Sequence, residues 1–578
     1  MAHAPAHAAP AAAAPETISV AEAVAQTLAA LGAGHCFGVV GSGNFEITNA
    51  LRASGVPFTA ARHEGGAATM ADAYARMSGR VGLVSVHQGC GLTNAATGIG
   101  EAAKSRTPVI VLAAEATAAS VGSNFSMDQP GLARAVTAEV HRVHSAGSAI
   151  ADTVRAFRTA RDQRRTVVLN LPLNVQGERV PAAQVRALQA TPPPVPMRAG
   201  DEAVTALTEL LAAAERPVLV AGRGGRGAGQ ALRALAAESG ALLATSAVAH
   251  GLFRGDDFDL GISGGFSSPL TAELISGADL IVGFGCALNM WTMRHGRLIT
   301  AGTRVAQVDL DEAALGAQRP IDLGVLGDSA ATAEAVTAQL RARDAARGNA
   351  ADGGARHGGY RTEANRIRIK AAARWRDTPT PDLSGGGKID PRELSRVLDE
   401  YLPAERIVSI DSGNFMGYPS AYLDVPDEFG FCFTQAFQSI GLGLGTAIGA
   451  ALAQPGRLPV LGTGDGGFLM GISELETAVR LRLPLVCIVY NDAAYGAEVH
   501  HFGGGATPPD MGAVEFPDTD IAAIARGFGA TGITVRGVAD LAPVREWLAS
   551  APTAPLVIDA KIASDGGAWW LAEAFAGH

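Results

Sequence analysis

The chain has 578 residues and a formal net charge of −10, with 48% hydrophobic and 18% charged residues. This acidic balance argues against nucleic acid as a partner, because nucleic-acid binding needs concentrated Lys and Arg. The length predicts about three or four domains of ordinary size, with an ample hydrophobic core.

No part of the sequence predicts insertion into a membrane. Every apolar run of about 18 residues is interrupted by a turn signal. Residues 1–16 are rich in Ala, Pro and His and lack the basic start and apolar middle of a signal peptide, so we expect a disordered tail. The five cysteines show no CxxC spacing, which favours buried free thiols over disulfides or zinc ligands. We therefore expect a cytoplasmic protein.

From Thr17 to about Gln176, strand-like and helix-like segments alternate. Such alternation predicts a parallel sheet covered by helices on both faces. Strands are expected at 35–40, 58–62, 81–86, 109–113 and 166–171, and helices at 20–31, 46–53, 67–77 and 94–103.

Two further α/β regions follow, separated by Gly- and Pro-rich joints. A Pro-rich linker at 191–196 precedes the second region, and loose stretches at 345–359 and 378–387 precede the third. Strands of the second region are expected at 217–221, 241–245, 280–283 and 305–309. We predict an α/β fold of three doubly wound parallel-sheet domains, at 17–190, 200–342 and 389–565, with a linker over 343–388.

The most informative stretch is Gly464-Asp465-Gly466-Gly467, which follows an apolar run at 458–461. Glycines here let the backbone approach a ligand closely, and Ser473 to Glu476 is typical of a capping box that opens a helix. A second apolar strand, 485–490, ends at Asn491-Asp492. Two carboxylates therefore stand at the carboxyl ends of strands, where doubly wound sheets bind ligands and where Mg²⁺ could join ligand phosphates. A glycine-rich turn with a capping Asp is the simpler alternative for Gly-Asp-Gly alone.

This pattern resembles the signature of thiamine-diphosphate enzymes, which is GDG followed at a fixed interval by an amide-bearing pair. Asp492 lies 27 residues after Asp465 (492 − 465), where that family places its second metal ligand, normally Asn. The resemblance implies Mg²⁺ held by Asp465, Asp492 and the backbone carbonyl of Ala494, with Asn491 as the alternative ligand if the register differs by one. The three α/β domains also resemble those of the acetolactate synthase, pyruvate decarboxylase and benzoylformate decarboxylase superfamily.

The resemblance also implies which residues hold thiamine diphosphate. Glu64 corresponds to the activating glutamate, whose carboxyl group hydrogen-bonds the pyrimidine N1′ and promotes the imino form of the cofactor. A surface Glu favoured at a helix N-terminus is the simpler explanation. The Gln438 carbonyl and Ile440, an apolar wedge beneath the cofactor, would hold the pyrimidine. The diphosphate would be bound by Gly413, Asn414, Gly466 and Gly467.

Several residues resemble substrate-pocket residues of the same superfamily. His87 stands where benzoylformate decarboxylases carry a His for proton transfer, a task that suits imidazole. Ser42 would hold a substrate carboxylate, or merely cap the following helix. Glu498 has the spacing of a pocket glutamate in pyruvate decarboxylases, and Gln129 lies in a segment similar to one that approaches the substrate. His501 replaces a tryptophan of acetolactate synthases, which favours a more polar pocket.

The resemblance implies an enzyme that depends on thiamine diphosphate and Mg²⁺. It would decarboxylate a 2-oxo acid and transfer the resulting enamine to a carbonyl acceptor, as acetolactate synthase-like carboligases do. The alternatives are a non-ligating decarboxylase, an acyloin or 2-hydroxyacyl lyase and, from another class, a catalytically silent scaffold or regulatory relative. FAD in the central domain is an unfavoured alternative, because Gly222 to Gly225 is a lone glycine cluster.

In this superfamily the pyrimidine and diphosphate sites come from opposite subunits. The resemblance therefore implies a homodimer or a homotetramer. The partners that we expect are a small-molecule 2-oxo acid and a carbonyl acceptor, with neither nucleic acid nor membrane.

Overall fold

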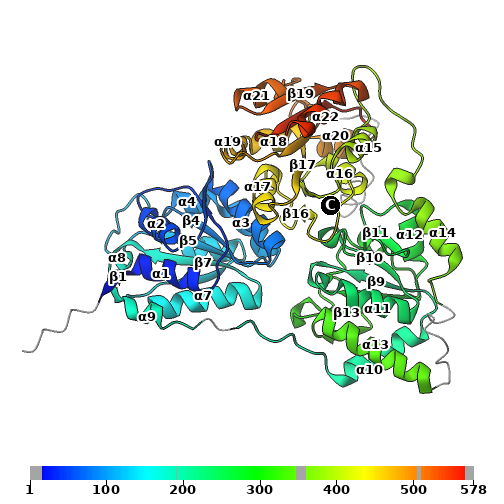
Figure 1. Ribbon diagram of the computed structural model, residues 1–578, viewed down its shortest axis with the longest axis horizontal. Helices are drawn as coiled ribbons and strands as arrows, with labels where there is room; N and C mark the ends of the chain where they lie inside the picture. The colour runs from blue at the N-terminus through cyan, green and yellow to red at the C-terminus, as the bar shows by residue number, and fades with distance from the viewer. Residues whose placement is uncertain (1–15, 190–191, 347–358, 504–508, 567–569, 571–578) are drawn as a thin grey trace, which may run out of the picture. The chain divides into compact units, whose positions relative to one another are not determined.

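The computed structural model of the protein describes residues 16–189, 192–346, 359–503, 509–566 and 570. The chain divides into two compact units, residues 1–75 with 79–193 and residues 76–78 with 194–578 (Figure 1). The first unit holds one six-stranded sheet and the second holds two, all of them parallel and covered by helices. The predicted α/β fold with three parallel-sheet domains is therefore confirmed. The predicted tail (except Glu16) and most of the stretch 345–359 lie outside the described residues.

The sheet of the first unit has the strand order β3-β2-β4-β5-β7-β6. Its long strands are buried on both faces, which explains their continuous apolar sequences. Ile110 and Leu112 share one core with α1, α2 and α7. The elements are β1 (Thr17–Ser19), α1 (Val20–Ala30), β2 (Cys36–Gly38), α2 (Phe45–Ala53), β3 (Phe58–Ala60), α3 (Glu64–Ser78), β4 (Gly82–Val86), α4 (Cys90–Asn94), α5 (Ala96–Lys104), β5 (Val109–Glu115), α6 (Gln129–Ala135), β6 (Glu139–Arg142), α7 (Ala149–Gln163), β7 (Thr166–Pro172), α8 (Leu173–Gln176), β8 (Arg179–Pro181) and α9 (Ala182–Arg186).

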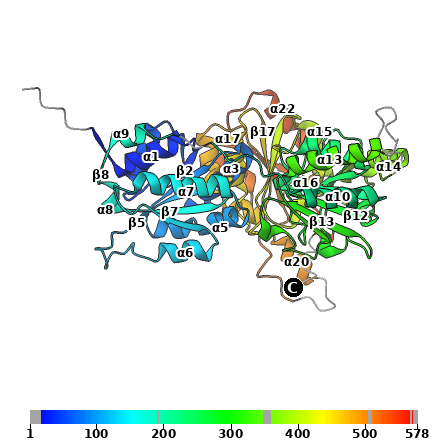
Figure 2. The same ribbon diagram turned by 90° about the horizontal axis from the view of Figure 1, so that it is seen from below.

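The central domain has the strand order β11-β10-β9-β12-β13-β14. Alternate residues of one strand enter different cores, since Leu219 packs with α10, α11 and α13 whereas Val218 packs with α12 and α14 (Figures 1 and 2). The elements are α10 (Asp201–Ala213), β9 (Pro217–Ala221), α11 (Gly229–Ser239), β10 (Leu242–Thr245), β11 (Asp259–Ile262), α12 (Pro269–Ser276), β12 (Leu280–Phe284), β13 (Arg304–Asp309), β14 (Leu323–Leu326), α13 (Ser329–Ala346) and α14 (Glu363–Ala372), the last within the stretch predicted as a linker.

The C-terminal domain has the strand order β16-β15-β17-β18-β20-β19, which repeats the topology of the sheet in the first unit and differs from that of the central domain. The chain leaves β15 for β16 at one edge and returns to β17 on the other side, so the sheet has a switch point between β15 and β17. The elements are α15 (Pro391–Tyr401), β15 (Arg406–Ile410), α16 (Gly417–Tyr422), β16 (Phe431–Phe433), α17 (Gly443–Ala453), β17 (Leu458–Gly464), α18 (Asp465–Met470), α19 (Ser473–Arg480), β18 (Val486–Asn491), α20 (Gly496–Gly503), α21 (Ile521–Gly527), β19 (Thr531–Val535), α22 (Ala542–Ala549) and β20 (Leu556–Lys561).

The predicted strands are confirmed, with small differences at their ends. β17 runs on to Gly464 because its last three residues keep pairing with β18. The predicted capping box at Ser473 is wrong, because Ile472 is the N-cap and its side chain cannot accept a hydrogen bond. The strands β6, β11 and β14, which the sequence does not predict, are short edge strands without a long apolar run.

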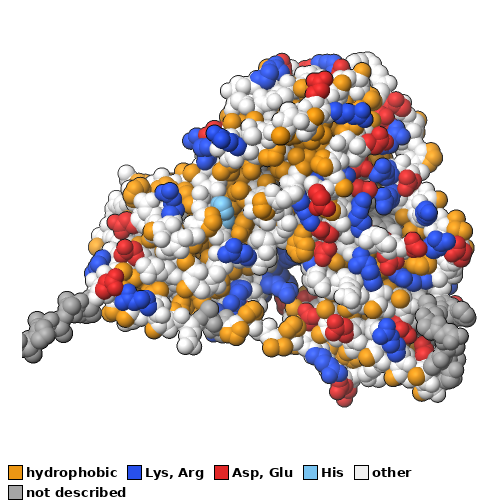
Figure 3. All heavy atoms as spheres, viewed as in Figure 1, with side chains coloured by type: hydrophobic (Ala, Val, Ile, Leu, Met, Phe, Trp, Pro, Cys, Tyr) orange, Lys and Arg blue, Asp and Glu red, His pale blue; other side chains and the backbone are white. Residues whose placement is uncertain are grey.

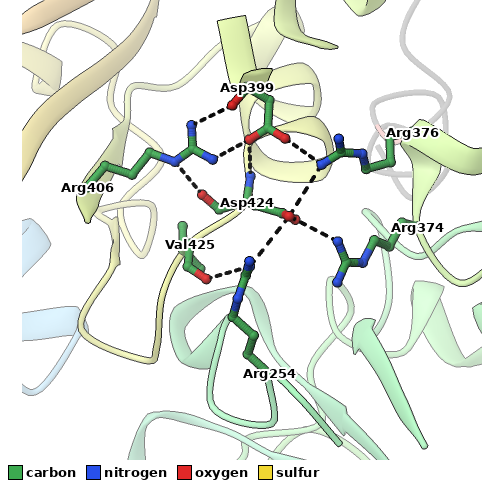
Figure 4. Close-up of polar contacts among 7 residues, drawn as sticks. All are labelled: Arg254, Arg374, Arg376, Asp399, Arg406, Asp424 and Val425. Atoms are coloured by element: carbon green, nitrogen blue, oxygen red, sulfur yellow. Dashed lines mark hydrogen bonds and ion pairs between the residues drawn. The ribbon is translucent and has the colours of Figure 1, made fainter. Parts of the chain in front are cut away.

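An ionic cluster joins the central domain to the C-terminal domain within the second unit (Figure 4). Asp424 Oδ2 lies 3.0 Å from Arg374 Nη1, 3.3 Å from Arg376 Nη1 and 3.5 Å from Arg254 Nη1. Asp399 pairs with Arg376 at 2.5 Å and with the buried Arg406. The cluster thus contains two aspartates and four arginines.

On the face shown in Figure 3, acidic and basic side chains are interspersed. No helix in the described part of the chain is both long and apolar enough to span a bilayer.

All five cysteines are free thiols, which confirms that part of the prediction. Four of them are buried as predicted, whereas Cys90 is exposed.

Candidate active site

The switch point of the C-terminal sheet gathers three aspartates. Asp411 follows β15, Asp465 follows β17 and Asp492 follows β18, and these three strands are direct neighbours. Because the strands are parallel, their carboxyl ends meet at one edge, which is where open α/β sheets bind ligands. The sequence prediction that Asp465 and Asp492 stand together at strand ends is confirmed.

Asp465 and Asp492 form a pair of carboxylates without a compensating cation. Burial raises the pKa of both carboxyl groups, and the charge of Asp465 raises the pKa of Asp492 further. Lys561 lowers the pKa of Asp465, but its ammonium group is already paired with Asp559 at 3.1 Å. Among the described residues, neither carboxylate has an ion pair with Lys or Arg. A divalent cation would neutralise such a pair, so the donor set fits Mg²⁺.

The structure also distinguishes Asp492 from its neighbour Asn491. The Asn491 amide is buried, where it donates to Asp559 Oδ1 at 2.8 Å and accepts from the Ala493 amide at 3.0 Å. Its polar atoms are thus engaged within the domain, which leaves Asp492 as the side chain facing Asp465. Ala494 follows on a segment fixed by the hydrogen bond from the Tyr495 amide to the Val514 carbonyl, 2.8 Å.

Asp411, the residue directly after β15, organises this site. Its carboxylate accepts from the Ser412 amide at 2.8 Å, the Gly441 amide at 3.0 Å and the Thr463 hydroxyl at 3.1 Å. Burial raises its pKa to about 6. A Cβ added to Gly467 would lie 2.5 Å from Asp411 Oδ2. The second glycine after Asp465 is therefore needed for contact with a protein carboxylate, and not only for approach to a ligand.

The predicted cofactor-holding residues border the same site. Gly413 and Asn414 lie three and four residues after the end of β15, and Gly466 and Gly467 lie in the first turn of α18. Gln438 has a φ of 58°, a left-handed conformation that a non-glycine residue adopts only at some cost in free energy. Ile440 is partly exposed, and the large apolar side chains near it, Phe437 and Met470, are more exposed still.

Glu498 lies on α20, shortly after Asp492, and is partly buried. Its amide donates to the Tyr495 carbonyl at 3.0 Å, which fixes the start of the helix. The helix also carries the adjacent pair His500 and His501. The polar character predicted for this segment is therefore present on one short helix beside the paired carboxylates.

In the first unit, Glu64 and His87 lie on either side of one glycine. Glu64 begins α3, is 9% exposed and accepts a hydrogen bond from Asn94 Nδ2 at 3.0 Å. A Cβ added to Gly91 would lie 3.4 Å from Glu64 Oε1 and 3.2 Å from His87 Cβ. Sequence reasoning missed the role of Asn94, because nothing in the residues around it indicates a partner 30 positions earlier.

His87 and Ser42 meet at the switch point of the first sheet, between β2 and β4. His87 Nδ1 lies 2.9 Å from the Gln88 carbonyl oxygen, which can only accept, so this nitrogen carries the hydrogen in that contact. The other ring nitrogen, Nε2, is then the basic one and lies 3.4 Å from Ser42 Oγ. The Phe125 ring covers the imidazole edge-on at 4.8 Å. This arrangement can pass a proton between an imidazole and a hydroxyl.

Gln129 differs from its predicted role. Its side-chain oxygen accepts from the Gly89 amide at 3.0 Å, and its nitrogen donates to Asn170 at 2.8 Å. The residue is 1% exposed. Gln129 therefore supports the loop that carries His87 and does not present its amide to a substrate. The predicted contact with substrate is wrong, and Gln129 is a positioning residue.

The glycine cluster of the central domain has a packing role. Gly222 and Gly224 follow β9 and lie against Gly285, which follows the adjacent strand β12, with the Gly224 amide 3.1 Å from the Gly285 carbonyl oxygen. A Cβ added to Gly224 would lie 2.8 Å from the Gly285 Cα. Close packing between the two loops therefore explains why glycines stand at the switch point of the central sheet, and a bound nucleotide is not needed to explain them. FAD remains an unfavoured prediction.

No group of three or more His, Cys, Asp or Glu side chains in the described ranges could hold a metal ion by itself. A metal ion at Asp465 and Asp492 would therefore need further oxygens, from backbone or from a ligand phosphate. Fold and site together define an α/β protein with a ligand site at the switch point of its C-terminal sheet.

Family models identify this class more closely. The N-terminal thiamine pyrophosphate-binding domain of thiamine pyrophosphate enzymes matches residues 18–137, the central domain matches 204–336 and the C-terminal thiamine pyrophosphate-binding domain matches 411–560. The chain belongs to the thiamine pyrophosphate enzyme family. It is an enzyme dependent on this cofactor, also called thiamine diphosphate, and it transfers or cleaves a C–C bond.

Curated relatives are similar to the chain over most of its length. It is 31% identical to a probable 2-ketoarginine decarboxylase of Pseudomonas aeruginosa, over 83% of each chain. It is 29% identical to an acetolactate synthase of Bacillus subtilis, over 94% of this chain and 93% of the relative. It is 28% identical to a sulfoacetaldehyde acetyltransferase of Castellaniella defragrans, over 91% and 90%. These names place the chain in the superfamily of 2-oxo acid decarboxylases and carboligases without fixing one activity.

Proposed function

We propose that the protein decarboxylates a 2-oxo acid and transfers the remaining fragment to a carbonyl acceptor, as an acetolactate synthase-like carboligase. The observation that carries the proposal is the uncompensated pair Asp465 and Asp492 at the switch point of a thiamine pyrophosphate-binding domain. The similarity to an acetolactate synthase over nearly the whole chain supports carboligation as the fate of the fragment.

Asp465, Asp492 and the Ala494 carbonyl would hold Mg²⁺, and the loops at 413–414 and 466–467 would bind the diphosphate. The Gln438 carbonyl and Ile440 would hold the pyrimidine. Bound thiamine diphosphate supplies a nucleophilic carbon and an electron sink for loss of CO₂. The chain itself contributes the carboxyl group of Glu64 for a hydrogen bond to the pyrimidine. Asn94 Nδ2 donates to Glu64 Oε2 at 3.0 Å and so orients this carboxyl group.

The substrate would meet the polar pair of the first unit. Ser42 is exposed, so its hydroxyl is available to hold a substrate carboxylate. His87 Nε2 is the basic nitrogen beside it and can accept or return a proton. Glu498 is the second proton-handling group that we propose. Gln129 holds the Gly89 amide and so keeps the His87 loop in place.

A second candidate function is decarboxylation without ligation. The contact between His87 and Ser42 favours it, because a proton delivered by imidazole would end the reaction as an aldehyde. The similarity to a probable 2-ketoarginine decarboxylase supports the same alternative.

We also propose that the active form is a homodimer or a homotetramer in which each site combines residues of two chains. Glu64→Gln and Asp465→Asn would each be inactive alone. Co-expression of the two variants should restore part of the activity, because some mixed dimers contain one intact site. Failure to restore any activity in purified mixed oligomers would contradict shared sites.

The decisive experiment is product analysis by mass spectrometry with thiamine diphosphate and Mg²⁺ present. A panel of 2-oxo acids is offered with and without an aldehyde or a second oxo acid. Wild type is compared with Glu64→Gln and with the control Glu46→Gln, which changes an exposed Glu on α2. We expect an acyloin or acetohydroxy acid whose formation falls at least about 100-fold in Glu64→Gln and is unchanged in the control.

Other outcomes would overturn the proposal in different ways. Aldehyde as the sole product would replace carboligation with the second candidate. Cleavage of an added acyloin or 2-hydroxyacyl thioester, without turnover of any 2-oxo acid, would indicate a lyase. Cofactor binding without any product would leave a catalytically silent relative.

A further inference from the structure

Trp570 is a buried aromatic residue near the C-terminal end of the chain. Its side chain is 5% exposed, and its indole Nε1 donates to the Asn414 carbonyl at 3.2 Å. A Cβ added to Gly417 would lie 2.5 Å from the indole ring. The indole therefore packs directly against both ends of the segment Asn414 to Gly417, which follows Gly413 in the candidate diphosphate loop.

The same indole is the first member of a chain of aromatic rings. Tyr418 lies edge-on to Trp570 at 5.1 Å and contacts Tyr490 at 5.9 Å. Tyr490 in turn stacks on Phe415 at 5.6 Å with an interplanar angle of 13°. Phe415 directly follows Asn414 of the candidate diphosphate loop, while Tyr490 lies on β18 two residues before Asp492. Trp570 is thus connected through three rings to both cofactor-holding segments of the domain.

Two further contacts involve Asp565 and Trp570. Tyr418 donates its hydroxyl to Asp565 Oδ2 at 2.5 Å. Trp570 also lies edge-on to Phe266 of the central domain, at 6.1 Å. The indole is held between two domains, so it can keep the neighbouring loop in one conformation before a ligand binds. Binding then costs less conformational entropy, which raises the affinity of the loop for its ligand.

We infer that Trp570 is a positioning residue that holds residues 413–417 in the conformation that binds the diphosphate. The inference rests on the proposed function for the identity of the ligand. It does not require that Trp570 touch the cofactor. Its direct consequence is a property of the loop itself, which can be measured without any cofactor.

The first test is hydrogen–deuterium exchange of peptides that cover 413–417, in the cofactor-free protein. The variants are Trp570→Ala, Trp570→Phe and the control Trp547→Phe. Trp547 is a matched control because it is 7% exposed and belongs to the same hydrophobic core, on α22. We expect exchange in this segment to be about 10-fold faster in Trp570→Ala, less so in Trp570→Phe, and unchanged in the control.

The second test is calorimetric titration of the same proteins with thiamine diphosphate in the presence of Mg²⁺. We expect a dissociation constant about 10-fold higher for Trp570→Ala than for wild type, with an intermediate value for Trp570→Phe, which keeps a ring but loses the donor. If Trp570→Ala does not fold, Trp570→Phe decides the question. Unchanged exchange together with unchanged affinity would overturn the inference. Failure of wild type to bind the cofactor would instead contradict the proposed function, and the exchange result would still decide the role of Trp570.

Discussion

Two pairs of aspartates in the second unit have opposite electrostatic surroundings. Asp465 is buried and Asp492, beside it, is partly exposed, and desolvation raises both of their pKa values. Asp399 and Asp424 also sit between elements of the same unit, but guanidinium groups surround them. The arginines of that cluster are Arg254, Arg374, Arg376 and Arg406.

The difference separates a structural site from a ligand site. A buried carboxylate that is paired and hydrogen-bonded joins elements of the fold, and its charge needs nothing from outside. A buried carboxylate that faces another carboxylate raises the free energy of the ligand-free state, and a bound cation removes that cost. The arginine cluster therefore joins the central and C-terminal domains, whereas the uncompensated pair is the site that we propose for a cofactor metal.

The largest expected effect is that of breaking the arginine cluster. Asp399→Asn would leave the buried Arg406 guanidinium without its carboxylate, so we expect a loss of about 3–5 kcal/mol in the free energy of unfolding. Urea denaturation measures this loss. Asp201→Asn, on an exposed side chain that pairs with Arg198, is the control and should have little effect. A loss below about 1 kcal/mol for Asp399→Asn would show that the cluster does not stabilise the fold.

The pH dependence of the metal-free protein should report the other pair. Because folding raises the pKa of both Asp465 and Asp492, the folded state binds more protons than the unfolded state. This pair therefore lowers stability as pH rises, and its cost should be small near about pH 4 and full near about pH 8. Thermal unfolding of wild type and of the double variant Asp465→Asn/Asp492→Asn isolates the effect, since the double variant should lose this part of the slope. Equal slopes would contradict the assigned pKa shifts.

Asp492→Asn should stabilise the metal-free protein and weaken metal binding. Removing one of two adjacent charges at this site relieves their repulsion, by about 1–3 kcal/mol near about pH 8. The amide keeps an oxygen ligand but lowers the charge of the site, so we expect Mg²⁺ affinity to fall about 10-fold. Thermal unfolding and calorimetry measure the two changes. A variant that is less stable than wild type without metal would contradict the comparison between the pairs.

The smallest effect should come from the exposed rim of the arginine cluster. Arg374 has a side chain that is 53% exposed, and Asp424 keeps Arg376 and Arg254 when Arg374 is removed. Arg374→Ala should therefore cost less than about 1 kcal/mol in the free energy of unfolding, measured by urea denaturation. A cost as large as that of Asp399→Asn would show that exposure does not decide which pairs matter.

The sequence predicts those parts of the molecule that short-range patterns encode. β9 is found at its predicted bounds, Pro217–Ala221, because an apolar run stands between polar residues and a glycine. The sequence also locates Asp465, which lies in a glycine motif, and Asp492, which lies at the end of an apolar strand. The bounds of α3 were predicted less well, since the helix begins at Glu64, where the His63 side chain accepts from the Gly65 amide.

Contacts between distant residues were not predictable from local patterns. Asp411 accepts hydrogen bonds from Gly441 and Thr463, which are 30 and 52 positions away. Gln129 resembled a substrate residue by its neighbours, and only its buried contacts with Gly89 and Asn170 assign it to loop support. In each case the side chain takes its role from the fold that brings its partners together.

Calorimetric titration of thiamine diphosphate, with and without Mg²⁺, tests the account most directly. It should be performed on wild type, Asp465→Asn and Asp399→Asn, each checked for folding beforehand. The account predicts tight binding to wild type that depends on Mg²⁺, loss of that dependence in Asp465→Asn, and nearly normal binding to folded Asp399→Asn. Equal, Mg²⁺-dependent binding by wild type and Asp465→Asn would contradict the assignment of the uncompensated carboxylates as the metal site.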